Sequence, residues 1–175
     1  MCDNNRMIVL GLDPGTATTG FGVVRYEEGK LFPLESGVLL TTPDMTMPAR
    51  LLSIYTDVHT LIDKHKPDTV ATERLFFDRN VTNALSVGRA IGVMLLAVEQ
   101  CGLPWAEYTP MQVKQAVTGY GGAEKHQVQA QVTRLLSLFE IPKPDDAADG
   151  LAVAICHAHS YRLGGMNVYS RRGGR

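Results

Sequence analysis

The sequence predicts an α/β fold: a mixed sheet of five strands with helices on both faces. Three strand-like segments open the chain, segments of helical periodicity then alternate with short strand-like ones, and Gly and Pro separate them. The 175 residues, 45% of them hydrophobic, are enough for one core. We therefore expect one domain over residues 7–161, with flexible termini at 1–6 and 162–175.

The first three strands are predicted to form an antiparallel meander. Met7–Leu12 is an apolar run, Gly20–Tyr26 is rich in valine and aromatic residues, and Leu31–Leu40 follows a Glu-Glu-Gly turn. Three such segments in close succession indicate strands that are neighbours in the sheet.

Helices and strands alternate in the next part of the chain. Apolar residues recur at helical spacing over Pro48–Lys66, and Asp68–Glu73 is expected to be a short strand. Val81–Gln100 has the length of a helix, and its apolar stretch predicts cover on more than one side. This helix is either central or a contact between subunits.

The last third of the chain is predicted to hold one strand and three helices. The strand covers Trp105–Tyr108, and Thr109-Pro110 is expected to cap a helix that ends near Thr118. A second helix is predicted at Ala123–Leu138, and prolines separate it from a last helix that begins near Asp145.

Composition excludes several classes of protein. No apolar run approaches the roughly 20 residues that cross a bilayer, so we expect a cytoplasmic protein without membrane contact. The net charge of -1 does not by itself indicate nucleic-acid binding. Cys156, His157 and His159 do not predict a zinc site, because adjacent residues of a helix face different ways and no fourth ligand is evident. We expect them to be packing and surface residues.

Two acids end predicted strands. Asp13 precedes a turn at Pro14-Gly15-Thr16, and Glu73 ends the strand that begins at Asp68. Ligands bind at strand ends in open α/β sheets, so both acids are candidates for a site. The alternatives are an Asx-turn at Asp13 and an exposed strand-end glutamate at Glu73.

Two further acids, Asp146 and Asp149, lie three residues apart at the start of the last helix. That spacing puts both carboxylates on one face, where their repulsion predicts a cation between them. The alternative is that acids in a first turn compensate the helix dipole, which explains Asp146 better than Asp149.

The fold could bring the four carboxylates together. Oxygen ligands select hard cations such as Mg²⁺ or Mn²⁺, and four clustered negative charges require about two such ions for balance. Two metals about 3.5 to 4 Å apart can activate water and stabilise the leaving oxygen of a phosphoryl displacement. The acids therefore predict a metal-dependent phosphodiester hydrolase.

Five motifs follow in order along the chain: Gly11–Thr16, Thr72–Phe76, Gln112–Gln115, Ala123–Lys125 and Asp146–Asp149. Together they resemble the RuvC family of bacterial Holliday-junction resolvases, over a match that runs from Met7 to His159. The resemblance implies an RNase H-like fold and a homodimer that nicks four-way DNA junctions symmetrically with magnesium. It also implies RuvA and RuvB, the branch-migration proteins, as partners.

The resemblance assigns roles to seven residues: the catalytic carboxylates Asp13, Glu73, Asp146 and Asp149, the active-site lysines Lys114 and Lys125, and the junction-stacking aromatic Phe76. A stacked base would contribute about 1 to 3 kcal/mol. Arg74, Arg79 and Asn80 are further candidates for DNA contact, with surface salt bridges as the alternative for the arginines. The alternative for both lysines is an ordinary solvated position on a helix.

The predicted mechanism uses two Mg²⁺ ions held by the four carboxylates, with Mn²⁺ as a substitute. The helix that begins at Val81, with Gly88 and Gly92 permitting close approach, is the candidate subunit contact. Three rival functions remain. The first is an actin-like ATPase or sugar kinase, because Asp13–Thr16 resembles the phosphate loop of those proteins. The second is a catalytically silent junction-binding module. The third is a nuclease that acts on another branched nucleic acid or on an RNA hybrid.

Overall fold

A single mixed sheet organises the chain. The computed structural model describes residues 6–74, 81–162 and 168–169, and the strand order is β3-β2-β1-β4-β5-β6. The first three strands form the predicted antiparallel meander, with bounds β1 Arg6–Asp13, β2 Thr18–Glu27 and β3 Lys30–Leu40. The predicted fold class is confirmed.

The other side of β1 carries the parallel part of the sheet. β4 (Thr69–Glu73) pairs parallel with β1, and β5 (Trp105–Tyr108) pairs parallel with β4. A two-residue strand, β6 (Val168–Tyr169), then pairs antiparallel with β5 and adds a sixth strand to the five that the sequence predicted. β6 lies within residues 162–175, which were expected to be a flexible terminus. The unpaired N–H and C=O groups of an edge strand can pair with a segment of two residues, which is too short to show periodicity in the sequence.

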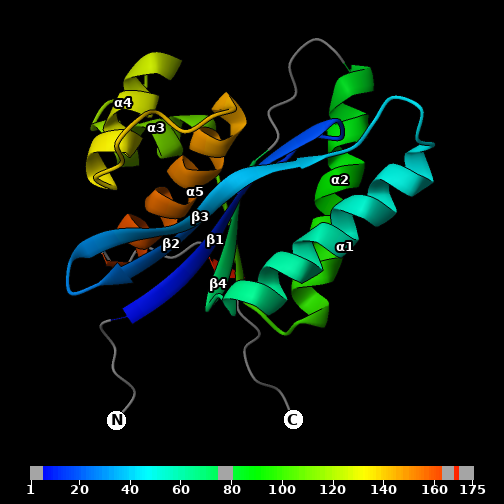
Figure 1. Cartoon of the computed structure of the whole chain (residues 1–175), viewed down its shortest axis with the longest axis horizontal. Helices are drawn as coiled ribbons and strands as arrows, with labels where there is room; N and C mark the ends of the chain where they lie inside the picture. Colours follow the sequence, from blue (N-terminus) through cyan, green and yellow to red (C-terminus); the bar gives the residue numbers. More distant parts are fainter. Residues whose placement is uncertain (1–5, 75–80, 163–167, 170–175) are drawn as a thin grey trace.

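Helices lie on both faces of the sheet, as predicted (Figure 1). On one face lie α1 (Met47–His65) and α2 (Val81–Gln100), and on the other α3 (Pro110–Thr118), α4 (Lys125–Leu135) and α5 (Asp145–Arg162). Among the described helices, none is both long enough and apolar enough to span a lipid bilayer.

Local capping sets the helix ends. Thr109 caps α3 through a capping box in which its hydroxyl accepts from the Gln112 amide and the Gln112 side chain accepts from the Thr109 amide. α4 is shorter at both ends than the predicted Ala123–Leu138. It begins after Glu124, which is extended, and it ends before Ser137, whose φ of 52° is left-handed.

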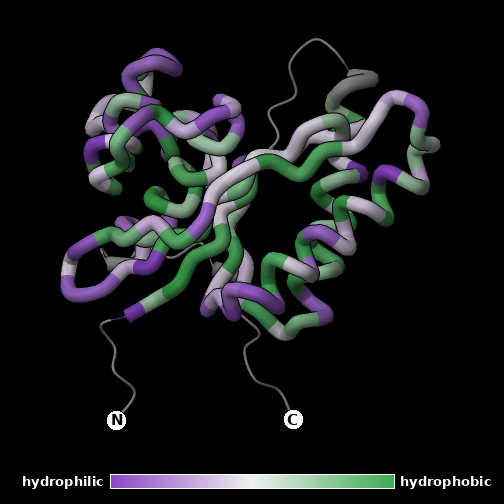
Figure 2. Tube along the Cα trace, in the orientation of Figure 1, coloured by the Kyte–Doolittle hydropathy of each residue, from purple (hydrophilic) through white to green (hydrophobic). Residues whose placement is uncertain are grey.

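The core has two halves, one on each face of the sheet. Val9 of β1 packs with α3, α4 and α5, whereas the next residue, Leu10, packs with α1 and α2. A strand that is buried on both faces needs apolar residues at successive positions, which explains the hydrophobic run of β1 (Figure 2).

α5 lies directly on the backbone of β1 and β2, because glycines line the contact. A Cβ at Gly11 would overlap the Gly150 carbonyl oxygen and the Ala154 amide nitrogen, and a Cβ at Gly20 would overlap the Asp146 carbonyl oxygen. A larger residue at either position would push the helix away from the sheet. The two glycines thus determine where the first turn of α5 lies.

Candidate active site

The ends of β1 and β4 place Asp13 and Glu73 side by side. The strands are parallel and pair up to Leu12 and Thr72, so the next residue of each lies at the same edge of the sheet. Both carboxylates face α5 because side chains alternate along a strand: Gly11, two residues before Asp13, lies against that helix. The two strand-end acids therefore share one face and one edge.

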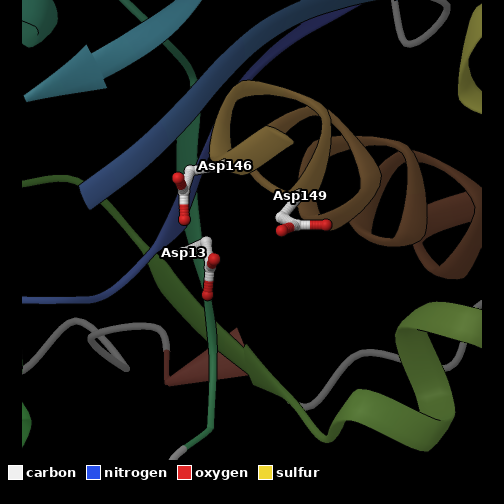
Figure 3. A group of neighbouring side chains, drawn as sticks. All are labelled: Asp13, Asp146 and Asp149. Carbon is white, nitrogen blue, oxygen red and sulfur yellow. The ribbon is translucent and has the colours of Figure 1, made fainter. Parts of the chain in front are cut away.

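α5 brings two more carboxylates to the same place. Asp13, Asp146 and Asp149 each offer an oxygen, and these three atoms lie within 4.8 Å of one another. Figure 3 shows the three side chains grouped between the end of β1 and the first turns of α5. Because Gly20 has no side chain, the Asp146 backbone lies directly against β2. The grouping of the three aspartates therefore depends on the close packing of α5 on the sheet.

The turn after Asp13 is held by hydroxyl groups. The Thr19 hydroxyl donates to the Gly15 carbonyl at 2.7 Å, and the Ser86 hydroxyl of α2 donates to the Thr16 hydroxyl at 3.1 Å. These bonds hold the turn without the Asp13 side chain. The Asp13 carboxylate instead lines a cavity. The geometry therefore does not favour the alternative in which Asp13 only stabilises the turn.

A cavity of about 260 Å³ lies between the sheet edge, α3, α4 and α5. Its charged lining consists of Asp13, Glu73, Asp149, Lys114 and Lys125. A second cavity, of about 240 Å³, shares its two strand-end acids and extends past Arg74 to α2. Glu73 thus joins the three aspartates, although it is not among the oxygens within 4.8 Å of one another.

Asp13, Glu73 and Asp149 have raised pKa values. Burial raises the pKa of Asp13 to about 7, and the negative charges of Glu73, Asp149 and Asp146 add to this effect. Burial also raises the pKa of Glu73 and Asp149, which repel each other. A cluster of partly buried carboxylates with only oxygen donors suits a hard divalent cation.

Two lysines supply the positive charge near the acids. Lys125 Nζ lies 3.0 Å from Asp149 Oδ2 and 3.9 Å from Asp145 Oδ2, and its hydrogen bond to Asp149 raises its pKa. Lys114 lines the same cavity, and its positive charge offsets part of the rise in the pKa of Glu73. Both lysines therefore lie beside the acidic cluster, although the Lys125 side chain is still 54% exposed.

The remaining candidates divide into described and undescribed residues. Arg74 lines the second cavity, and its Nε lies 3.6 Å from Glu107 Oε2, so it has an ionic partner as well. Phe76, Arg79 and Asn80 lie outside the described residues.

One acid near the site was not predicted. Asp145 is exposed, begins α5 and shares Lys125 with Asp149. Its position beside Asp146 in the sequence was the available indication, but a first-turn acid is so common that sequence alone assigns it no role.

Comparison with known proteins identifies the family. The sequence model described as crossover junction endodeoxyribonuclease RuvC matches residues 9–157. The chain belongs to the RuvC family. The RuvC protein of Desulfitobacterium hafniense is 53% identical over 168 residues, which cover 96% of this chain and 99% of that protein. The protein of Syntrophomonas wolfei is 52% identical over 157 residues, 90% of this chain and 91% of its own.

Solved structures agree. The structure of Thermus thermophilus RuvC in complex with a Holliday junction substrate matches with a TM-score of 0.87 and 39% identity, over 91% of this chain and 97% of that one. The yeast mitochondrial Holliday junction resolvase Ydc2 matches with a TM-score of 0.62 and 16% identity, which shows a shared fold alone. Family membership confirms the predicted RNase H-like fold and makes this RuvC-family chain an endodeoxyribonuclease, as the acids and motifs predicted.

Proposed function

We propose that this protein resolves four-way DNA junctions by paired nicks, through hydrolysis assisted by two divalent ions. The observation that carries the proposal is the convergence of Asp13, Asp146 and Asp149 within 4.8 Å, beside Glu73. The relative from Thermus thermophilus was solved with a Holliday junction substrate, which supports the choice of DNA.

The four carboxylates would hold the ions, Mg²⁺ by preference and Mn²⁺ as a substitute. When bound, the ions supply Lewis acidity for the attacking water and the departing 3' oxygen. The oxygen-only donor set fits them, and the pKa of Asp13 is raised first by burial and then by the negative charge of its neighbours, which a bound cation would offset. Asp13 and Glu73 are fixed by the sheet, and Asp146 and Asp149 by α5, so the ligands come from two rigid elements.

Lys114 and Lys125 would bind the scissile phosphate. Both line the cavity that contains the acids, and Lys125 opens α4, where free amide groups favour an anion. Lys125 is held by Asp149 in the protein alone. When a phosphate and cations enter, the ammonium can turn from the carboxylate to a phosphoryl oxygen and offset the charge that develops there.

Dimerisation through α2 would present two such sites to a two-fold symmetric junction. Leu85 and Leu96 of α2 are 58% and 51% exposed, and the Cβ position of Gly92 meets open space. These residues lie 7 and 4 apart, a spacing that puts them on one side of the helix. Light scattering tests the dimer, and a monomer mass at micromolar concentration would contradict it.

The other assignments are proposals carried from the family. Phe76 would stack on a junction base, and Arg74, Arg79 and Asn80 would contact the DNA backbone. RuvA and RuvB are the proposed partners, and the cytoplasm is the proposed location.

The test uses three substrates: a synthetic four-way junction, a linear duplex and an RNA–DNA hybrid, each with Mg²⁺. We expect paired nicks in the junction alone, and none from Asp13→Asn. The matched control is Asp63→Asn, which removes a carboxylate paired with Lys66 on the surface of α1 and is expected to cut normally. Intact junctions with wild-type protein would favour a silent binding module, and cleavage of the hybrid would favour a different substrate.

A further inference from the structure

Three polar residues of α5 have no place in the proposed reaction, yet all contact one segment of the chain. His157 Nδ1 lies 2.9 Å from the Tyr108 hydroxyl, His159 Nδ1 lies 3.1 Å from the Ala116 carbonyl, and Cys156 Sγ donates to the Gln112 carbonyl at 3.7 Å. The segment from Tyr108 to Ala116 is the end of β5 followed by α3. Sequence alone assigned these residues to packing and surface, whereas they join α5 to β5 and α3.

Tyr108 connects this contact to the acids. It pairs in register with Glu73, and its carbonyl accepts from the Arg74 amide at 2.7 Å. The main chain of Tyr108 thus holds the end of β4, while its side chain holds α5. Asp149 lies about two turns along α5 from His157, so Tyr108 contacts both the strand and the helix that carry the acids.

The second contact connects α5 to a lysine. His159 binds the carbonyl of Ala116, which lies two residues after Lys114 on α3. The His159 contact therefore ties α3, the helix that carries Lys114, to α5.

The His157 contact is a costly one for the fold. Tyr108 and His157 are 4% and 1% exposed, among apolar residues of the core. Among the described residues, His157 Nε2 is one of three buried side-chain atoms without a hydrogen-bond partner. An apolar pair of similar size would fill the same space without leaving a polar atom unsatisfied, so stability does not explain the histidine.

We infer that His157 and His159 are positioning residues, which hold α5 against β5 and α3 and so fix the separation of the catalytic groups. The inference rests on the proposed function, because it concerns the same acids and lysine. A polar contact with defined length and direction specifies one position of the helix, whereas apolar side chains tolerate sliding.

The test compares four variants with the whole protein. Tyr108→Phe and His157→Leu remove the contact between Tyr108 and His157. His157→Asn keeps a side-chain nitrogen near the position of Nδ1. His159→Ala removes the contact with the Ala116 carbonyl from a half-buried site. Tyr26→Phe is the matched control, since Tyr26 packs against the same core cluster but lies on β2 away from the acids. The measurements are junction nicking at saturating DNA, the KM for the junction, Mn²⁺ affinity by calorimetry, and the thermal midpoint.

For Tyr108→Phe and His157→Leu we expect the nicking rate to fall about tenfold and Mn²⁺ binding to weaken about fivefold, with KM changed less than about twofold. Each of these variants also leaves the other side chain buried without this partner, so the midpoint should fall in both. His157→Asn should recover nicking to within about threefold of wild type, and His159→Ala should lose about threefold.

A purely structural role predicts a lower midpoint with wild-type nicking and Mn²⁺ affinity in the folded variants, and no advantage of Asn over Leu. That result would overturn the inference. If Tyr108→Phe does not fold, the test rests on His157→Leu and His159→Ala. Normal Mn²⁺ affinity and normal nicking in both of these variants would also overturn the inference. Failure of the wild type to nick would count against the proposed function, while Mn²⁺ affinity would still decide the role of the contacts.

Discussion

The two faces of the sheet pack their helices in different ways. On one face, α5 touches the strand backbone itself, because Gly11 and Gly20 leave no side chain between. On the other, α1 and α2 pack on the sheet through large side chains, such as Leu10 of β1, Ile54 of α1 and Met94 of α2. The four acids of the candidate site lie on the first face, where the helix position is fixed by backbone contact.

The difference shows that one face of the sheet fixes the position of a helix, while the other face mainly contributes to the stability of the fold. Backbone contact leaves α5 little freedom, so Asp146 and Asp149 reach the strand acids in a defined arrangement. Side-chain packing contributes hydrophobic stabilisation but accepts changes of shape. Substitutions on the α5 face should therefore damage catalysis first, and those on the α1 face should damage stability first.

The largest effect is expected from Gly20→Ala. Its Cβ would overlap the Asp146 carbonyl oxygen, so the first turn of α5 must move and the proposed metal ligands separate. We expect a loss of at least about a hundredfold in junction nicking, with a cost of about 1 to 3 kcal/mol in the free energy of unfolding. Nicking rates and urea unfolding measure the two effects. Wild-type nicking by this variant would show that backbone contact does not position the acids.

Ile54→Ala makes the opposite test on α1. Ile54 is 1% exposed, and its truncation leaves a cavity that should cost about 2 to 5 kcal/mol in the free energy of unfolding. At a temperature where the variant is folded, its nicking rate should stay within about twofold of wild type, because no catalytic group moves. A large loss of activity in the folded variant would mean that the two faces are coupled.

The next test uses pH without metal. The folded pKa of Asp13 is raised to about 7 from 3.8, so the folded state holds a proton that the unfolded state releases. Stability from this group is present at acid pH and is lost as the pH rises from about 4 to about 7. Urea unfolding in EDTA should show that decline, and Asp13→Asn should flatten it. A stability that rises over this range in the wild type, and equally in the variant, would contradict the assignment.

The smallest effect is expected at the surface of the other face, with Glu35→Gln. Glu35 of β3 accepts from Lys64 Nζ at 2.6 Å and pairs with His65, and these contacts lower its pKa. Its contribution is present at neutral pH and is lost as the pH falls through its lowered pKa, the opposite sign to Asp13. An exposed pair contributes about 0 to 1 kcal/mol, and urea unfolding at pH 7 measures it. A loss several times larger would show that this pair is a main link between α1 and β3.

Sequence predicted the parts of the site that depend on local pattern. An apolar strand ending in an acid identifies Asp13 and Glu73, and a spacing of three identifies Asp146 and Asp149 as a pair. Motif resemblance added Lys114 and Lys125, which the structure places beside the acids. Their roles remain predictions.

Other features depend on contacts between distant segments, which no local pattern contains. Gly20 is an ordinary strand residue until α5 packs on it, and His157 is an ordinary helix residue until Tyr108 meets it. β6 is two residues long, too short for periodicity to reveal. These features were found only after the fold was known.

The most direct test of the central claim is the anomalous scattering of crystals soaked in Mn²⁺. We expect two peaks about 3.5 to 4 Å apart among the carboxylates of Asp13, Glu73, Asp146 and Asp149. Peaks located elsewhere, or no peak in this cluster at a saturating concentration, would contradict it.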